Sequence, residues 1–455
     1  MLTYELKKAP GVPLYESLYR CIRGDILSGR LQPGQKLPSK RALCANLKVS
    51  KITVEGAYNQ LLAEGYIRSR EKVGYFVEAV DHVTQQSTPR EEKSLPRQTL
   101  LDLTANGPAK FPFSVWSRLQ REVMLDLAEQ MLTETDNQGL WDLRQAIADQ
   151  LRQFRGMQVR PEHILIGAGT DFLYNLLVQL LGRDKIYAVE EPGYSKIRQI
   201  YGAAGAACVG AELDDQGVDP QKLRDAQVLH ISPSHHFPTG LVTPLSRRQA
   251  LLLWAREEQD RWIIEDDYDS EFRFAAHPMP AMQSLDPDKV IYMNTFSKSL
   301  APSIRISYMV LPPALMTRYR QQLGFYSCTV PGFQQHTLAR FLSRGHFEQH
   351  VNRMRKFYKA RRNQLMSALT ECPIAELLTV QEENAGLHFL VRVATDMTDE
   401  ALEQYCAKAG LRVQCLSGYY HGPVPEQARR CLVVNYSGLS DEQLTKLEEI
   451  LAIMG

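Results

Sequence analysis

Short apolar runs alternate with helix-length stretches through most of the chain beyond residue 100, and this alternation limits the folds that the chain can adopt. The runs are three or four residues long: Ile164–Ile166, Ile186–Val189, Val228–Ile231, Trp262–Ile264, Val290–Met293 and Tyr308–Leu311. Strands separated by helices favour βα units on a largely parallel sheet. We therefore predict an α/β fold for this region, with its functional residues at the carboxyl ends of the strands.

Length and composition indicate a globular protein with more than one domain. At 455 residues the chain is too long for a single hydrophobic core. No apolar run approaches the roughly 20 residues that a membrane-crossing helix needs, and the N-terminus lacks the layout of a signal peptide, so a cytoplasmic protein is expected. The eight cysteines form no C-x-x-C pair and no cluster at metal-ligand spacing, which favours reduced thiols and no metal site.

The first 80 residues carry the pattern of three short helices followed by a hairpin. A first helix is expected in residues 13–28, a second from the N-cap Ser39 to Leu47, and a third from the N-cap Ser50 to about Ala63. Apolar side chains at helical spacing would form the core: Leu14, Leu18, Ile22, Ile26, Val54, Ala57, Tyr58 and Leu61. Two strands around a charged turn are expected in residues 67–77. The pattern indicates a winged helix-turn-helix.

Charge is shared unevenly between the two ends of the chain. Residues 1–80 hold 13 Lys and Arg against 7 Asp and Glu, a net charge of +6, and the remainder holds 40 against 45, a net charge of −5. A basic domain favours a polyanionic partner, although such an excess is also common on a solvated face. On double-stranded DNA, the third helix would place Lys51, Thr53 and Asn59 nearest the base edges. The other predicted DNA-binding residues are Ser39, Lys40, Arg41, Ser50, Arg68, Arg70 and Lys72. The alternative is a winged helix that contacts other proteins.

The ordered motifs of this region resemble the winged helix-turn-helix of GntR-family transcription factors. They are Leu37-Pro38-Ser39-x-Arg41, Val49-Ser50-x-x-Thr53-Val54, Ala57-Tyr58, Glu64-Gly65-Tyr66 and Gly74-x-Phe76-Val77. The resemblance implies a DNA-binding domain, which we place at residues 1–78. A polar, proline-containing linker is expected at 79–100 and a larger domain at 101–455, with a smaller subdomain from about residue 341.

Residues suited to cofactor chemistry follow several of the predicted strands. Gly167-Ala168-Gly169-Thr170-Asp171 opens a helix whose amide hydrogens could cradle a phosphate. Tyr194 could stack on a flat ring. One carboxylate of the acid-rich segment Glu265–Arg273 could pair with a pyridine nitrogen. Each feature taken alone is also explained by a tight turn, a surface tyrosine or an acidic helix start.

Lys298 lies in the segment Thr295-Phe296-Ser297-Lys298-Ser299-Leu300-Ala301-Pro302-Ser303-Ile304-Arg305, just after a predicted strand. A lysine held there, with its pKa lowered by desolvation, can form a Schiff base with an aldehyde. The two hydroxyls and the arginine could hold a phosphate by charge-assisted hydrogen bonds. This combination predicts pyridoxal phosphate, although a lysine after a strand is more often a solvated surface residue.

In their order along the chain, these motifs resemble the fold-type I pyridoxal-phosphate aminotransferases, and a GntR-type front on such a domain resembles the MocR subfamily of bacterial regulators. The resemblance implies that Lys298 takes the cofactor aldehyde and that Asp266 pairs with the pyridine nitrogen, with Glu265 or Asp267 as alternatives. The remaining implied ligands are Tyr268 for the ring hydroxyl, Tyr194 for the ring face, and Gly169, Thr170, Thr295, Ser297 and Arg305 for the phosphate. It also implies a head-to-tail homodimer.

The sequence departs from the aminotransferase pattern at two positions. Phe237 stands where most aminotransferases have an asparagine, so that a donor to the ring hydroxyl must come from His235, His236 or Tyr268. Val433 stands where an arginine usually clamps the substrate carboxylate, and the lack of that clamp weakens both an enzyme and an amino-acid sensor.

We therefore expect a transcriptional regulator that senses pyridoxal phosphate, as in control of vitamin B6 synthesis, or an amino compound. One alternative is an active amino acid aminotransferase with an accessory DNA-binding domain. The other is a DNA-binding protein whose larger domain has lost the cofactor.

Overall fold

The computed structural model describes residues 4, 13–70, 73–79, 100–104, 110–272, 279–381 and 386–453, without the side chain of residue 453. The chain divides into two compact units, residues 1–97 and 98–455, which are considered separately. Most of the predicted linker, residues 80–99, lies outside the described residues, as does the predicted DNA-binding residue Lys72.

The N-terminal unit contains three helices and a hairpin: α1 (Leu14–Leu27), α2 (Lys40–Leu47), α3 (Lys51–Ala63), β1 (Ile67–Arg70) and β2 (Gly74–Val77). As predicted, the side chains of Ser39 and Ser50 cap α2 and α3, each accepting a backbone N–H from the first turn. The predicted apolar stripes of α1 and α3 meet in one core, in which Leu18, Ile22 and Leu61 are fully buried. The strands β1 and β2 pair antiparallel as the wing. The winged helix-turn-helix prediction is confirmed.

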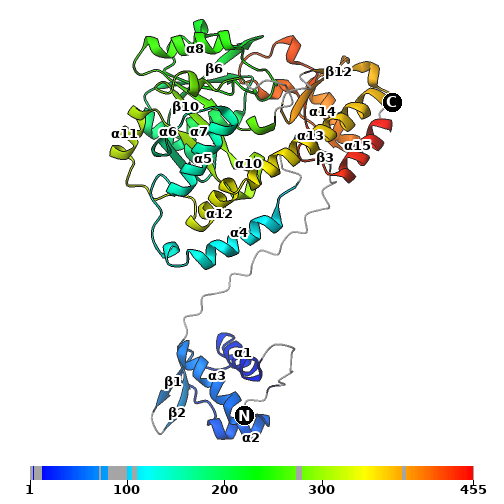
Figure 1. Cartoon of the computed structure of the whole chain (residues 1–455). Helices are drawn as coiled ribbons and strands as arrows, with labels where there is room; N and C mark the ends of the chain where they lie inside the picture. The colour runs from blue at the N-terminus through cyan, green and yellow to red at the C-terminus, as the bar shows by residue number, and fades with distance from the viewer. Residues whose placement is uncertain are drawn as a thin grey trace. The chain divides into compact units, whose positions relative to one another are not determined.

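The larger unit is built on an eight-stranded sheet in the order β4-β11-β10-β9-β8-β5-β6-β7 (Figure 1). The strands are β4 (Ile164–Gly167), β5 (Ile186–Glu191), β6 (Ala207–Asp214), β7 (Gly217–Val218), β8 (Val228–Ile231), β9 (Trp262–Asp266), β10 (Val290–Thr295) and β11 (Ser307–Val310). The central strands run parallel, while β11 and β7 pair antiparallel with their neighbours. The predicted α/β class with a mostly parallel sheet is confirmed. The strands β6 and β7 have no counterpart among the apolar runs of the sequence.

Helices cover both faces of this sheet, which is why the central strands are mostly apolar and buried. One face packs on α6 (Thr170–Leu181), α7 (Ser195–Ala203) and α11 (Pro313–Gln322). The other face packs on α4 (Phe113–Asp126), α5 (Trp141–Arg155), α8 (Leu245–Glu257) and α12 (Gly332–Ser343). Short helices α9 (Met282–Leu285) and α10 (Phe296–Ser299) precede and follow β10. None of the helices in the described ranges is both long enough and apolar enough to span a lipid bilayer.

The C-terminal part forms a separate core around a three-stranded antiparallel sheet of β12 (Leu378–Gln381), β13 (His388–Val393) and β15 (Cys431–Asn435). Its helices are α13 (His346–Glu371), α14 (Asp399–Lys408) and α15 (Asp441–Ile453). The long helix α13 packs in the main core through Phe347 and in the C-terminal core through Leu365. The C-terminal core also includes Leu101, because β3 (Leu101–Asp102) pairs with β14 (Leu411–Arg412).

Candidate functional site

Lys298 lies on α10, one turn after the carboxyl end of β10, and its side chain is half-buried. Burial lowers the pKa of its ammonium group to about 8, while the carboxylates of Asp269 and Asp266 act to raise that pKa. The Nζ atom is 5.9 Å from the centre of the Tyr268 ring. A lysine with such a pKa is neutral often enough at neutral pH to act as a nucleophile.

Three consecutive carboxylates end β9 and begin the loop after it, and the alternation of strand side chains separates them. Glu265 points toward α9, where its two carboxylate oxygens accept the backbone N–H groups of Met282 and Gln283, both at 3.0 Å. Asp267 accepts a hydrogen bond from Tyr292 on the same side of the sheet. Asp266 lies on the opposite face, the face covered by α6 and α7.

Asp266 is held by side chains that the sequence analysis did not identify. One carboxylate oxygen accepts a hydrogen bond from Tyr174 of α6 and lies 3.5 Å from Nε2 of His230. The Nδ1 atom of His230 is in turn 2.7 Å from the hydroxyl of Tyr201. The other oxygen, Oδ1, is buried and has no hydrogen-bond partner among the described residues. A buried carboxylate oxygen in this state is suited to receive a protonated ring nitrogen.

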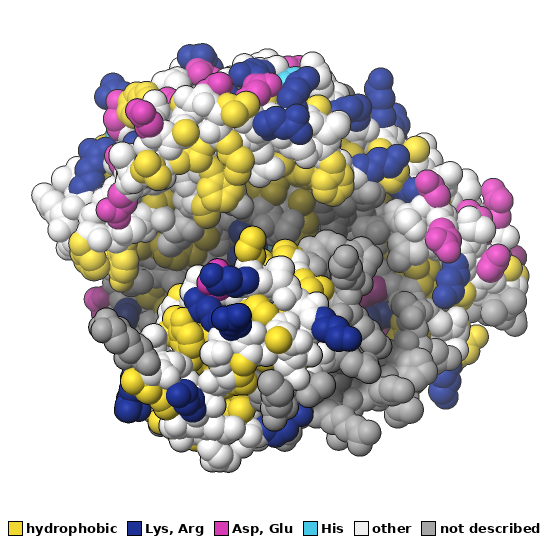
Figure 2. Space-filling view, turned by 90° about the horizontal axis from the view of Figure 1, so that it is seen from below, with side chains coloured by type: hydrophobic (Ala, Val, Ile, Leu, Met, Phe, Trp, Pro, Cys, Tyr) yellow, Lys and Arg dark blue, Asp and Glu magenta, His cyan; other side chains and the backbone are white. Residues whose placement is uncertain are grey.

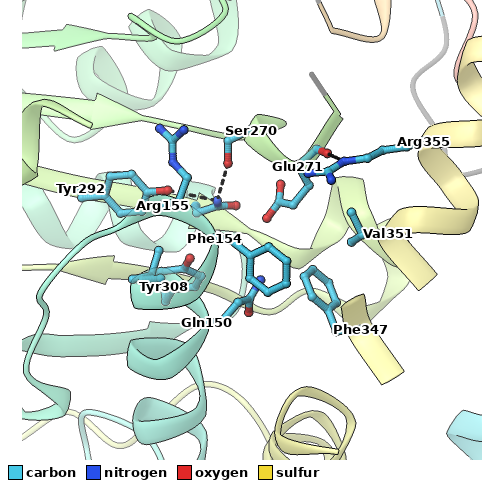
Figure 3. A pocket seen from close by; sticks show the side chains of 12 residues that line it. Gln150, Phe154, Arg155, Ser270, Glu271, Tyr292, Tyr308, Phe347, Val351 and Arg355 are labelled. Carbon is cyan, nitrogen blue, oxygen red and sulfur yellow. Dashed lines mark hydrogen bonds between the residues drawn. The ribbon is translucent and has the colours of Figure 1, made fainter. Parts of the chain in front are cut away.

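Asp267 instead pairs with Arg155, which lines a small cavity between the sheet, α5 and α13 (Figure 3). Its carboxylate is 2.8 Å from Arg155, and both side chains are nearly fully buried. Nearby, Arg355 of α13 donates to the backbone oxygen of Glu271, whose own carboxyl has its pKa raised to about 7 by burial. The cavity volume of about 30 Å³ is near that of one water molecule. This cavity is too small for a cofactor. Asp267 is already engaged in its ion pair with Arg155.

The predicted phosphate cradle comes together where β4 meets α6. Gly169 precedes α6 with φ = +90° and, being glycine, has no side chain to cap the amide hydrogens of the first turn, which begins at Thr170. A β-carbon at Gly169 would collide with the guanidinium of Arg305, so only glycine lets the arginine lie across the helix start. Arg305 Nη2 is 3.4 Å from the carboxylate of Asp171. Amide hydrogens at a helix start beside an arginine form a site for an anion.

The predicted hydroxyl ligands lie at the start of α10. Thr295 caps this helix, because its hydroxyl accepts the backbone N–H of Ser297 at 3.1 Å, and it also accepts from Ser307 at 2.8 Å. The hydroxyl of Ser297 is buried and has no partner in the described part of the chain. An unpaired buried hydroxyl beside the cradle is consistent with a polar group that completes the site when bound.

A cluster of buried histidines lies beside Tyr268, the residue whose ring is near Lys298. His235 Nδ1 is 2.7 Å from the carboxylate of Asp269 and 3.3 Å from the hydroxyl of Tyr268. The ring of His388, from β13, is 4.7 Å from that of His235. The adjacent His236 is bonded to Thr239, and burial lowers the pKa of His236 to about 3. Tyr268 and His235 thus lie close enough to act on one ligand, whereas His236 stays neutral and is engaged by Thr239.

Two predicted positions remain: Tyr194, expected at the ring face, and Val433, at the position where an arginine usually binds the substrate carboxylate. Tyr194 is 49% exposed and its ring meets that of Phe237 edge-on at 6.2 Å. Val433 is buried in an apolar cluster with Leu390 and Tyr419, against which Phe237 packs. The position of the usual carboxylate clamp is therefore part of an apolar wall that joins the two sheets of the unit.

The predicted DNA-binding residues lie on α2, α3 and the wing. Lys40 and Lys51 each have their ammonium group 3.7 Å from the carboxylate of Glu55. Arg68 pairs with Glu78 at 3.0 Å, and Arg70 lies over the ring of Phe76. The other predicted residues are Arg41, which is exposed, and Ser39, Ser50 and Thr53 at the helix starts. Figure 2 shows Lys and Arg side chains exposed on the side of the molecule seen from below.

Family models match nearly the whole chain. Residues 14–77 match the model of bacterial regulatory proteins of the gntR family, and residues 98–451 match the model of aminotransferase class I and II. The crystal structure of Pyrococcus horikoshii kynurenine aminotransferase is similar with a TM-score of 0.67 and 25% identity, covering 78% of this chain and 91% of that chain. LysN, the alpha-aminoadipate aminotransferase of Thermus thermophilus, has a TM-score of 0.66 at 22% identity, covering 78% and 92%.

Relatives of similar length are regulators by name. The uncharacterized HTH-type transcriptional regulator YdeL of Bacillus subtilis is 35% identical, covering 97% of both chains. The probable rhizopine catabolism regulatory protein MocR of Rhizobium meliloti is 33% identical, covering 96% of this chain and 93% of that protein. The HTH-type pyridoxine biosynthesis transcriptional regulator PdxR of Corynebacterium glutamicum is 33% identical, covering 88% and 87%.

Proposed function

The chain belongs to the MocR subfamily of GntR-family transcriptional regulators, and from this premise we propose that its aminotransferase-like domain binds pyridoxal phosphate at Lys298 and signals the occupancy of that site to the DNA-binding domain. The observation that carries the proposal is a lysine with a lowered pKa beside a buried carboxylate whose Oδ1 has no hydrogen-bond partner among the described residues. The two groups match the two reactive positions of the cofactor, its aldehyde and its ring nitrogen.

Each residue of the site has a separate task in this proposal. Lys298 bonds to the aldehyde, and Asp266 keeps the ring nitrogen protonated. Tyr268 and His235 donate to the ring hydroxyl, in place of the asparagine that Phe237 replaces. Tyr194 covers the ring, and the phosphate is held by Gly169, Thr170, Thr295, Ser297 and Arg305. When bound, the cofactor supplies an aldehyde that combines reversibly with amines.

The apolar wall around Val433 helps to determine which compound can be the effector. Without an arginine there, a free amino acid would leave its carboxylate against Leu390 and Tyr419, which is costly because a buried charge needs a partner. Pyridoxal phosphate itself is therefore the effector that we favour over an α-amino acid. The name of the relative PdxR, a pyridoxine biosynthesis regulator, is in line with control of vitamin B6 synthesis.

Signalling requires two arrangements of the protein with different affinities for the cofactor. The site lies between the two sheets of the larger unit, since His388 of β13 contacts His235 and the backbone oxygen of Pro238. A bound cofactor can therefore bias how the C-terminal sheet closes on the main sheet. That bias would alter how the DNA-binding domains are presented to the operator.

We further propose a head-to-tail homodimer. Large apolar side chains in α4 and shortly after it are exposed on the single chain: Phe113, Met124, Leu125 and Leu132. Large apolar side chains exposed in this way favour association with another protein surface. Sedimentation of the pure protein would measure the dimer directly.

The test is a titration of DNA binding with the cofactor. A promoter fragment next to the protein's own coding sequence is titrated with the cofactor-free protein, then with added pyridoxal phosphate, then with candidate amino acids. We expect the cofactor to change the affinity and the Lys298→Ala variant not to respond. Equal affinity with and without the cofactor, under conditions where absorbance shows it bound, would contradict the proposal.

A second candidate function is an amino acid aminotransferase, favoured by the joint presence of Lys298, Asp266 and Tyr268 in one site. Steady conversion of an amino donor and a keto acid by the pure protein, lost in Lys298→Ala, would support it.

A further inference from the structure

The outward face of α3 carries an apolar side chain. The buried stripe of α3 is formed by Val54, Ala57, Tyr58 and Leu61. At 100° per residue, Ile52 and Asn59 point to the opposite side of the helix. Ile52 is 80% exposed, more than any other large apolar side chain described in the N-terminal unit. The core of this unit is complete without it, so folding does not account for an isoleucine here.

Polar and cationic groups surround this isoleucine. Lys51 precedes it, and Glu55, one turn later, lies 3.7 Å from the ammonium groups of both Lys51 and Lys40. Gly56 has no side chain, and a β-carbon there would be 3.1 Å from the ring of Tyr15. The surface around Ile52 is therefore charged at its margin and apolar at its centre, without a side chain that covers the isoleucine.

In the major groove of DNA, thymine is the base that presents an apolar group, its C5-methyl. A helix that enters the groove with phosphate contacts at its margin places the centre of its outward face against the base edges. Among the base edges, such a methyl group is the best partner for an exposed isoleucine at that centre, because the other groups there are mainly hydrogen-bond donors and acceptors.

We propose that Ile52 reads a thymine of the operator by contact with its C5-methyl group. This specificity rests on the DNA-binding function of the domain and adds an apolar contact to Lys51, Thr53 and Asn59, the residues that sequence analysis placed at the base edges. Deoxyuridine lacks this methyl group and otherwise presents the same edge. The contact is therefore lost when one thymine is replaced, with no change in base pairing.

The experiment uses the full-length protein and duplexes selected from a pool with a randomised core. Each thymine of the selected site is replaced in turn by deoxyuridine, and affinities are measured for the wild type, Ile52→Ser and Leu27→Ser. Leu27 is the matched control, because it is an apolar residue of the same domain, 38% exposed, at the end of α1. Unfolding curves of the two variants check that the domain stays folded.

We expect one thymine per half-site at which loss of the methyl weakens binding of the wild type and of Leu27→Ser about fourfold, the factor for one methyl group left in water. Ile52→Ser should bind both duplexes equally. If no thymine of the selected site shows this loss, or if the methyl effect persists in Ile52→Ser, then thymine recognition by Ile52 is overturned while DNA binding stands. A selection that enriches no sequence overturns DNA binding and the readout together.

Discussion

Glu265 and Asp266 are neighbours in β9, yet their carboxylates lie on opposite faces of the sheet. Glu265 caps α9 through two backbone N–H groups, and Asp266 accepts from Tyr174 on the face where α6 begins. The pairing of Asp266 with Met293 in β10 fixes this arrangement, because paired residues of parallel strands point to the same side. A shift of one residue would exchange the two carboxylates.

The first prediction concerns the ring nitrogen. Asp266→Asn should bind pyridoxal phosphate about tenfold to a hundredfold more weakly, as expected when a hydrogen bond to a charged group is lost. Retention of the cofactor after dialysis, measured by its absorbance, tests this. Glu265→Gln is the control, since it should lose stability and keep the cofactor. Equal retention by Asp266→Asn and the wild type would remove Asp266 from the site.

The second prediction concerns the buried ion pair of Asp267 and Arg155. Burial acts to lower the pKa of Arg155, but the charge of Asp267 raises that pKa above its ordinary value overall. Asp267→Asn leaves the guanidinium without its charge partner, which should cost about 3–5 kcal/mol of unfolding free energy. The double variant Arg155→Met with Asp267→Asn should recover much of that loss. Urea unfolding of the three proteins measures the difference, and a single variant as stable as the wild type would refute it.

The sequence was sufficient for features that depend on local patterns. The caps Ser39 and Ser50 and the apolar stripe of α3 were predicted because each depends only on residues a few positions apart in the sequence. Short β7 and the mostly exposed β6 lack a continuous apolar run, so they were missed.

The supports of Asp266 could not be predicted, because they come from distant elements. Tyr174 is on α6, and nothing in its surroundings marks it as different from other helix tyrosines. His230 offered a signal, since a histidine within the apolar run Val228–Ile231 must find a partner when buried. The choice among three consecutive carboxylates likewise depended on strand register, which one sequence does not define.

The third prediction is a pH dependence of cofactor uptake. Only the neutral amine attacks an aldehyde, and a pKa of about 8 leaves roughly a quarter of Lys298 neutral at pH 7.5. The reactive fraction rises with pH, is one half at about pH 8 and levels off roughly one pH unit higher, because the pKa of this cation is lowered. Stopped-flow absorbance across pH 6–10 measures the rate of cofactor uptake and hence the pH at which that rate is half of its maximum. A midpoint above 10, as for a solvated lysine, would contradict a desolvated site.

The carboxylate of Asp269, near Lys298, should also affect the pH midpoint of cofactor uptake, and this effect can be tested separately. Asp269 acts to raise the pKa of Lys298, so Asp269→Asn should move the midpoint of uptake to lower pH. Lys298→Ala should show no slow, pH-dependent phase. An unchanged midpoint in Asp269→Asn would mean that this carboxylate does not act on the lysine.

The fourth prediction separates phosphate contacts from base contacts. Arg41 is exposed at the start of α2, and if it neutralises one phosphate it releases about one counterion on binding. Arg41→Ala should then weaken binding to all duplexes alike and reduce the slope of log affinity against log salt by about 0.9. Arg183→Ala, an exposed arginine of the larger unit, serves as the control and should leave the slope unchanged. Ile52→Ser removes no charge, so it should change the affinity at one base position and keep the full salt slope. The two variants therefore distinguish phosphate contacts from base contacts. An unchanged slope in Arg41→Ala would instead favour the interpretation that this surface contacts a protein.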